Sequence, residues 1–257
     1  WPVETLVGVG LLTFQPAYLN ILPLYVVLLL MAPVLLLLAR VNVLLALGAS
    51  VALYVLAQLF SLAPPIWPGA GGWYFNPFAW QLLFTCGLMI GVALDAGARL
   101  PWRRALDVLA PAYLLLTFAW AMAGFHPILE FPPLPRFIWA LDKTNLGLPR
   151  LLHILALAYC VARLPVEAWL KARPGLSAPL VLMGRRSLPV FCVGTVLSLA
   201  AQVTRPSFDG AVSYDLLIFF VGFSVLWLVA WTLEWYGQGQ AAGTRRKSAP
   251  AQDAALA

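Results

Sequence analysis

The chain has 257 residues, of which 62% are hydrophobic and only 10% are charged, and its mean hydropathy is +0.88. Soluble domains are about 45–50% apolar and about 25% charged, so this composition excludes a soluble globular enzyme, a disordered chain and a disulfide-rich secreted domain. The 16 Lys and Arg residues against 10 Asp and Glu give a net charge of +6, which in a membrane protein bears first on topology.

Seven stretches are apolar enough to suggest transmembrane helices, since one crossing takes about 20 apolar residues. They cover residues 21–39, 41–60, 78–95, 105–124, 146–161, 187–203 and 212–233. The sequence therefore predicts an all-α membrane protein, a polytopic transmembrane helix bundle with about seven spans. Residues 5–14 are too short to span, and we interpret them as an interfacial helix or the end of an upstream element.

The domain organisation follows from the same pattern. We interpret residues 1–236 as a single transmembrane domain and residues 237–257, which are rich in Gly, Ala, Gln and basic residues, as a disordered cytoplasmic tail. Because the chain begins at Trp1 rather than Met, we expect it to be the C-terminal part of a longer protein, with N-terminal helices missing.

The basic residues divide unevenly between the two ends of these spans. With the N-terminus outside, 12 of the 16 fall on one side and 4 on the other. The richer side holds Arg40, Arg99, Arg103, Arg104, Arg163, Lys171, Arg173, Arg185, Arg186, Arg245, Arg246 and Lys247, and the poorer side holds Arg136, Lys143, Arg150 and Arg205. Cytoplasmic loops carry the excess of Lys and Arg, so the split predicts a cytoplasmic C-terminus.

Two outer loops, residues 61–77 and 125–147, are unusual for connections between spans. They combine Pro, Gly and aromatic residues with few charges, and the second also contains His126 and Glu130. Such loops are too apolar to be simple solvated linkers. We expect them to pack on one another or to dip back into the bundle.

Residues that often bind metals are few. Cys86, Cys160 and Cys192 all fall within spans, where small buried apolar side chains are the simplest interpretation. His126 and His153 are too few for a metal cluster, and we expect no metal. His153, one turn after Arg150, is an ionisable group inside a span. The pair could hold an anionic group near the outer mouth, or Arg150 could anchor headgroups while His153 satisfies a carbonyl.

The sixth span carries a polar stripe within about 80° of arc at 100° per residue, formed by Ser187, Thr195, Ser198 and Gln202. The stripe fits either helix–helix hydrogen bonds or the wall of a polar passage, and the spacing does not decide between them. Gly87 and Gly91 favour close helix packing in the third span. No phosphate-binding loop, dinucleotide fingerprint, nucleophile elbow or zinc-protease motif occurs.

Four stretches resemble the OpgC family of bacterial membrane proteins, within the wider superfamily of multi-span acyltransferases. They read QPAYLNILPLY at 15–25, NPFAWQLLF at 76–84, KTNL and RLLH at 143–146 and 150–153, and GRRSLPVFC at 184–192. The resemblance runs from about residue 15 to residue 202 in consistent order.

This resemblance implies a multi-pass protein of the bacterial inner membrane that transfers an acyl group, succinyl in the founding case, from cytoplasmic acyl-CoA to a periplasmic glucan or related carbohydrate. It implies no permanently bound cofactor, since acyl-CoA is the donor substrate. The partners are the lipid bilayer, acyl-CoA and the carbohydrate acceptor, with no nucleic acid. The family's His-Asp motif is absent here, so the catalytic histidine is expected upstream of Trp1.

Together with the topology, this resemblance indicates candidate sites. Phosphates of acyl-CoA favour arginine at the inner face, which points to Arg103, Arg104, Arg185 and Arg186. A sugar binds aromatic faces and polar edges, which on the acceptor side points to His153, Arg150, Lys143, Asn76, Trp80 and Trp73. A passage for the pantetheine arm could be lined by Ser187, Thr195, Ser198 and Gln202.

Two other functions fit the same composition. The first is a membrane transporter or flippase whose outer loops bind sugar, although transporters are usually built from repeats and the sequence has none that we detect. The second is a non-catalytic membrane scaffold.

Overall fold

The computed structural model describes the whole chain except residues 1, 16–19, 99–102, 125–134, 209–211 and 254–257. The described part is helical, with a single isolated antiparallel bridge between Pro65 and Gly72. The chain forms two compact units, residues 1–164 and 165–257. Of the outer-loop residues singled out above, His126 and Glu130 lie outside the described residues.

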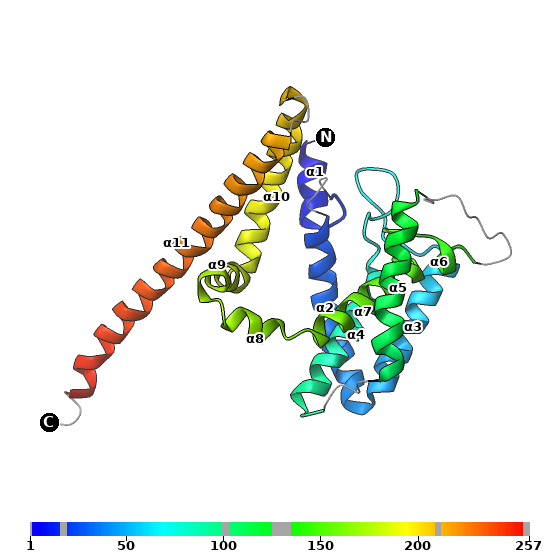
Figure 1. Cartoon of the computed structure of the whole chain (residues 1–257), viewed down its shortest axis with the longest axis horizontal. Coiled ribbons are helices and arrows are strands. Elements are labelled where there is room, and N and C mark those ends of the chain that lie inside the picture. Colours follow the sequence, from blue (N-terminus) through cyan, green and yellow to red (C-terminus); the bar gives the residue numbers. More distant parts are fainter. Residues whose placement is uncertain (1, 16–19, 99–102, 125–134, 209–211, 254–257) are drawn as a thin grey trace. The chain divides into compact units, whose positions relative to one another are not determined.

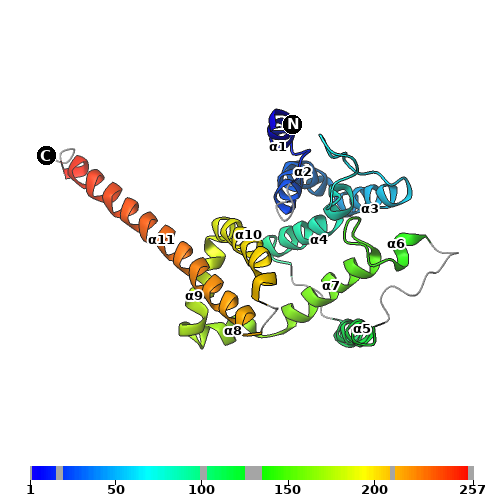
Figure 2. The same cartoon turned by 90° about the horizontal axis from the view of Figure 1, so that it is seen from above.

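The first unit contains seven helices among its described residues, in two packed groups (Figures 1 and 2). These are α1 (Pro2–Gly10), α2 (Ile21–Val41), α3 (Val43–Leu59), α4 (Pro77–Asp95), α5 (Arg104–Met122), α6 (Arg136–Trp139) and α7 (Leu148–Arg163). Helices α2, α3 and α4 pack against one another, and α5 packs against α7.

Asparagine sets the start of two of these helices. Asn42 separates α2 from α3, and its side chain accepts a hydrogen bond of 2.7 Å from the Leu44 N–H. Asn76 caps α4 in the same way, and Pro77 follows at the first turn. Both positions agree with the preference for Asn at the N-cap and Pro at the first helical position.

The second unit consists of α8 (Val166–Lys171), α9 (Pro174–Arg185), α10 (Ser187–Thr204), the 3₁₀ turn η1 (Arg205–Phe208) and α11 (Val212–Asp253). Ion pairs join the ends of α10 to α11: Arg186 pairs with Glu234 at 3.2 Å, and Arg205 with Asp215 at 2.9 Å. Between them, the side chain of Leu226 lies against Gly194.

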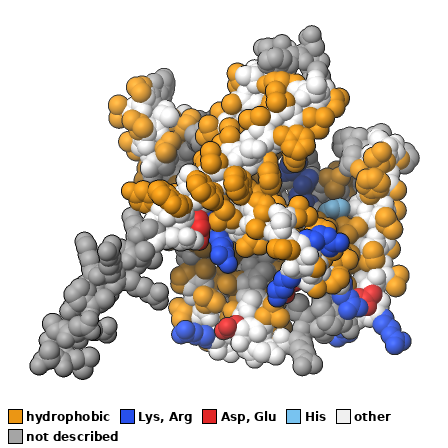
Figure 3. Space-filling view, turned by 60° about the vertical axis from the view of Figure 1, so that its left-hand side comes forward, with side chains coloured by type: hydrophobic (Ala, Val, Ile, Leu, Met, Phe, Trp, Pro, Cys, Tyr) orange, Lys and Arg blue, Asp and Glu red, His pale blue; other side chains and the backbone are white. Residues whose placement is uncertain are grey.

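Five helices in the described part of the chain are long and apolar enough to cross a membrane, namely α2, α4, α5, α10 and residues 212–238 of α11. All seven predicted stretches are helical, but the count of about seven spans is not confirmed. Helix α3 has 17 residues and α7 has 16, and α7 carries Arg150, His153 and Arg163. Hydrophobic side chains cover most of the helical surface in view (Figure 3), as a lipid environment requires.

Two further details bear on predicted segments. Helix α11 extends to Asp253, so it includes part of the segment from residue 237 that is rich in Gly, Ala, Gln and basic residues. The predicted close packing at Gly87 and Gly91 is wrong within the described residues, since a Cβ built at either position would meet no atom within 4 Å.

Candidate functional site

The chain between α6 and α7 docks onto α3 and α4 through its backbone. Four consecutive carbonyl oxygens, of residues 143 to 146, each accept a hydrogen bond from a residue in α3 or at the start of α4. The pairs, acceptor first, are Lys143 with the Trp80 indole N–H (3.1 Å), Thr144 with the Asn76 backbone N–H (2.9 Å), Asn145 with the Gln58 amide, and Leu146 with the Tyr54 hydroxyl (2.8 Å). Because all four carbonyls are satisfied, the segment is held along its whole length.

Asn76 lies at the centre of this docking and is fully buried. Its side-chain oxygen accepts from the Phe78 N–H at 3.1 Å, while its amide donates to the Leu62 carbonyl at 2.6 Å and to the Asn145 side chain at 3.0 Å. Of the two predicted alternatives for loops 61–77 and 125–147, packing on one another or dipping back into the bundle, the first is observed here, because Asn76 belongs to one loop and Asn145 to the other.

Contacts within the docked segment also fix its conformation. The Asp142 carboxylate accepts from the Thr144 N–H and the Asn145 side-chain amide, both at 2.9 Å. Leu146 adopts φ +47°, a left-handed conformation that disfavours a branched side chain. A Cβ on Gly147 would lie 2.1 Å from the Ala140 carbonyl oxygen, so only glycine fits there.

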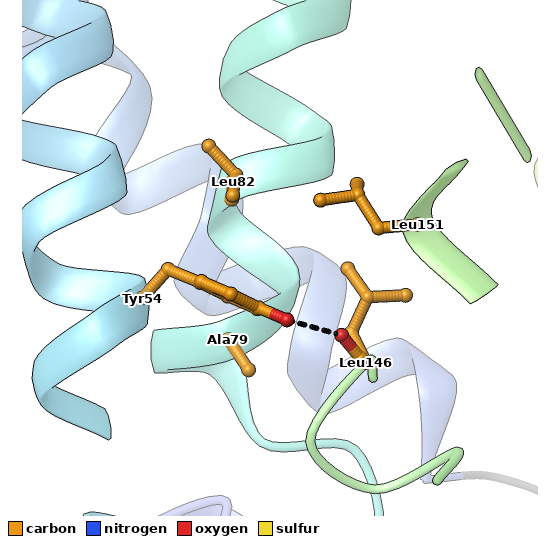
Figure 4. Close-up of a cluster of buried hydrophobic side chains, with 5 residues drawn as sticks. All are labelled: Tyr54, Ala79, Leu82, Leu146 and Leu151. Carbon is orange, nitrogen blue, oxygen red and sulfur yellow. Dashed lines mark hydrogen bonds between the residues drawn. The ribbon is translucent and has the colours of Figure 1, made fainter. Parts of the chain in front are cut away.

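A hydrophobic cluster lies beneath the segment, formed by Tyr54, Ala79, Leu82, Leu146 and Leu151 (Figure 4). These side chains come from α3, α4, the docked segment and the first turn of α7. The Tyr54 hydroxyl points at the Leu146 carbonyl, which lies two residues before α7 begins. The cluster therefore fixes where α7 starts.

A buried cluster of three polar side chains also joins α3 to α4. The Ser50 hydroxyl donates to the Gln81 amide oxygen at 2.6 Å, and the Gln81 amide donates to the Ser50 carbonyl at 2.8 Å. Thr85 donates to the Gln81 backbone carbonyl at 2.8 Å. Gln81 is fully buried with its hydrogen-bonding groups satisfied, so this group holds two helices together.

The six acceptor-side candidates divide by exposure. Asn76 is buried and makes the hydrogen bonds given above, and Trp80 is half-buried with its N–H bound to the Lys143 carbonyl. Trp73 is 4% exposed, and its indole N–H has no partner among the described residues. Lys143 is exposed. Arg150 donates to the Leu141 carbonyl at 3.4 Å, and its buried Nε has no partner in the described part of the chain.

His153 is half-buried on α7 and faces α5. Its Nδ1 lies 3.1 Å from the Thr117 hydroxyl, and its ring meets the Tyr113 ring edge-on, with centroids 6.4 Å apart. The Tyr113 hydroxyl donates to the Pro149 carbonyl at 2.9 Å. Tyr113 and Thr117 are one helical turn apart, as are Pro149 and His153, so two matched contacts join α5 to α7.

The same two helices meet again at Asp107, near the start of α5. Asp107 accepts from the Tyr159 hydroxyl and from Arg163 Nε, both at 2.7 Å, and Arg163 completes a forked ion pair through its second nitrogen. Asp107 is not among the site residues predicted from the sequence. Its only sequence signal is the spacing of Tyr159 and Arg163, four residues apart on one face of α7. Arg103 and Arg104, the predicted donor-side residues nearby, are exposed.

The other predicted pair, Arg185 and Arg186, lies in the second unit. Arg186 donates through Nε and a terminal nitrogen to one Glu234 oxygen, at 3.3 and 3.2 Å. Arg185 is exposed, and no partner for its guanidinium lies among the described residues. The two adjacent arginines therefore differ: one links α10 to α11 and the other is available.

The polar stripe of α10 is exposed at three of its four residues. Thr195 is half-buried and donates to the Phe191 carbonyl of its own helix at 3.0 Å, whereas Ser187, Ser198 and Gln202 are exposed. Cys86, Cys160 and Cys192 are free thiols. Among the described residues, no three His, Cys, Asp or Glu side chains gather as a metal site.

Comparison with known protein families shows to which family the chain belongs. Residues 1–238 match the family described as OpgC protein, so the chain belongs to the OpgC family. With its apolar helices, this makes it a membrane protein. No curated protein and no solved structure matches the chain.

Proposed function

We propose that the protein is an inner-membrane acyltransferase that moves an acyl group, succinyl in our assignment, from cytoplasmic acyl-CoA to a periplasmic glucan or related carbohydrate. The observation that carries this proposal is the family match over residues 1–238. In the reaction, a sugar hydroxyl oxygen bonds to the thioester carbonyl carbon, the carbon–sulfur bond breaks, and the hydroxyl proton is passed on so that CoA leaves as the thiol. We assign no catalytic base among the described residues.

On the donor side, we assign the binding of acyl-CoA to arginines whose side chains are exposed. Arg103 and Arg104 are exposed at the start of α5, and Arg185 is exposed with no partner among the described residues. Guanidinium groups bind phosphate through forked hydrogen bonds. Arg186 is engaged with Glu234, so we assign it a role in holding α10 on α11 and assign Arg185 the contact with the donor.

On the acceptor side, we distinguish residues that contact the sugar from residues that hold the site in shape. Lys143 is exposed, Trp80 is half-buried and His153 is half-buried on α7, so these three can meet a sugar. Asn76 and Trp73 are buried, and we assign them to shaping the loops that present the site. Arg150 lies one turn before His153 on α7 and completes the group.

The polar stripe of α10 is our proposed wall for the pantetheine arm. Ser187, Ser198 and Gln202 are exposed side chains on one side of an apolar helix, which supports a polar passage better than a tightly packed helix contact. The uneven split of basic residues supports a cytoplasmic C-terminus and outer loops that face the periplasm.

Mass spectrometry of periplasmic glucans tests the proposal. Cells that carry the intact gene should yield glucans with an added acyl mass, cells without it should yield unmodified glucans of the same size distribution, and complementation should restore the modification. Identical acylation in all three strains would contradict the proposal. A loss of the glucans themselves from the periplasm would favour a transporter.

A further inference from the structure

Thr117 of α5 and His153 of α7 form a side-chain pair whose hydrogen count can be worked out. The Thr117 hydroxyl has one hydrogen, and it is donated to the Leu114 carbonyl of its own helix at 3.0 Å. The Thr117 oxygen is then an acceptor at its 3.1 Å contact with His153 Nδ1. With the hydroxyl hydrogen directed at Leu114, the contact is a hydrogen bond when His153 Nδ1 carries the ring hydrogen, and we assign the ring to this tautomer.

This assignment determines the chemistry of the other ring nitrogen. A neutral imidazole carries one hydrogen, so when Nδ1 holds it, Nε2 has a lone pair and accepts hydrogen bonds. In the described part of the chain, no residue donates to Nε2. The Tyr113 ring lies edge-on to the imidazole, and the Tyr113 hydroxyl donates to the Pro149 carbonyl. The imidazole of His153 therefore contacts two residues of α5, Tyr113 and Thr117.

We propose that Thr117 is a positioning residue of the acceptor site: it fixes His153 in the Nδ1–H tautomer, and Nε2 then accepts a hydrogen bond from a hydroxyl group of the carbohydrate. This inference rests on the proposed function. It selects one of the roles open to His153, because a neutral Nε2 acceptor orients a sugar hydroxyl, whereas steadying an acyl carboxylate would require a donor there. Thr117 acts through His153 and does not itself touch the sugar.

Nitrogen-15 NMR of histidine-labelled protein in detergent reads the tautomer without reference to activity. At a pH where the ring is neutral, the His153 signals, assigned by their loss in His153→Gln, should show a protonated Nδ1 and an unprotonated Nε2. Thr117→Val should shift the ring toward the Nε2–H form, whereas Thr117→Ser should keep the wild-type pattern. An Nε2–H ring in the wild type, or an unchanged ring in Thr117→Val, would overturn the proposal.

Glucan acylation in cells gives the second readout. Thr117→Val should lower acylation roughly ten-fold, the effect of losing the hydrogen bond that His153 Nε2 accepts from the carbohydrate, and Thr117→Ser should restore it. Thr232→Val is the matched control, since Thr232 makes the same bond to the carbonyl three residues earlier, at 2.9 Å, on exposed α11. Protein levels are checked by blot.

The outcomes separate this inference from the proposed function. A changed tautomer with wild-type acylation in Thr117→Val would overturn the role of Nε2 and leave the acyltransferase assignment standing. No acylation in wild-type cells would overturn the proposed function and with it the acceptor role, while the NMR result on the tautomer would stand by itself.

Discussion

The Tyr54 hydroxyl donates a hydrogen bond of 2.8 Å to the Leu146 carbonyl, across 92 positions of the chain. Leu146 is fully buried and lies two residues before α7. The bond therefore connects α3 to the start of the helix that carries His153. Because the neighbouring carbonyls are bound in the same way, the α3–α4 pair acts as the support on which α7 is positioned.

Removing this bond should weaken the support without disturbing the hydrophobic packing. Tyr54→Phe keeps the ring in its cluster but leaves the buried Leu146 carbonyl without its donor, which should cost about 1–2 kcal/mol. Thermal unfolding in detergent measures the change. Tyr25→Phe is the control, because Tyr25 lies 52% exposed on α2 and should unfold like the wild type. Equal midpoints for the two variants would mean that the bond contributes nothing.

Asn76 and Asn42 allow a matched comparison of two helix caps. Both cap a helix through the side-chain oxygen, but only Asn76 is buried and also donates to Leu62 and Asn145. Asn42→Ala should cost about 1 kcal/mol, and Asn76→Ala about 2–4 kcal/mol, because the cap is lost and the Leu62 and Asn145 oxygens lose their donor at the same time. Chemical denaturation in mixed micelles compares them, and similar losses would contradict the central place of Asn76.

Helix positions were predictable from the sequence because apolar runs and their polar caps are local features. The Asn76-Pro77 pair, for example, sits where the third predicted stretch begins. The docking of residues 143–146 was not predictable, because its acceptors are backbone carbonyls, which every residue has. Asn76 is predicted from the sequence to bind sugar, but its side-chain amide is instead hydrogen-bonded to Leu62 and to Asn145 of the docked segment.

The same reasoning explains the polar pairs that the sequence analysis missed. Asp107 meets Tyr159 and Arg163 across 52 and 56 positions, and no local pattern reveals such a pairing. Arg185 and Arg186 are adjacent and looked equivalent, but Glu234, 48 positions away, engages only the second. Tertiary packing decides which charged side chain is free.

The ion pair at Asp107 should contribute more than an exposed pair. Asp107→Asn removes a forked contact between α5 and α7 whose side chains are 30–40% exposed, and should lower the unfolding midpoint. Glu167→Gln removes the Glu167–Lys171 pair within α8, whose side chains are 75–82% exposed, and should leave the midpoint nearly unchanged. A larger loss in Glu167→Gln, measured by thermal unfolding, would reverse this assignment.

Arg185 and Arg186 should differ in function. Arg185→Gln should raise the acyl-CoA concentration needed for half-maximal acylation roughly ten-fold, since a charged hydrogen bond to phosphate is lost. Arg186→Gln should instead lower thermal stability, as should Glu234→Gln, because either change breaks the pair between α10 and α11. Assays in inside-out membrane vesicles give the donor dependence. An unchanged requirement in Arg185→Gln would leave that residue without a donor role.

The membrane topology can be tested by cysteine labelling at two exposed basic positions. In a variant without its native cysteines, Lys143→Cys should react with an impermeant maleimide in cells whose outer membrane is permeabilised. Arg185→Cys should react only after the inner membrane is opened, because the richer set of Lys and Arg marks the cytoplasmic side. Labelling at residue 143 only after opening of the inner membrane would invert the topology.

Transfer of label across the membrane tests the central claim most directly. Inside-out vesicles enclosing periplasmic glucan are supplied from outside with succinyl-CoA labelled in the acyl group. The account predicts that label becomes bound to the enclosed glucan when the intact protein is present, and that vesicles without it show none. Glucan that stays unlabelled in vesicles with well-expressed protein, under conditions where the succinyl-CoA remains intact, would contradict the account.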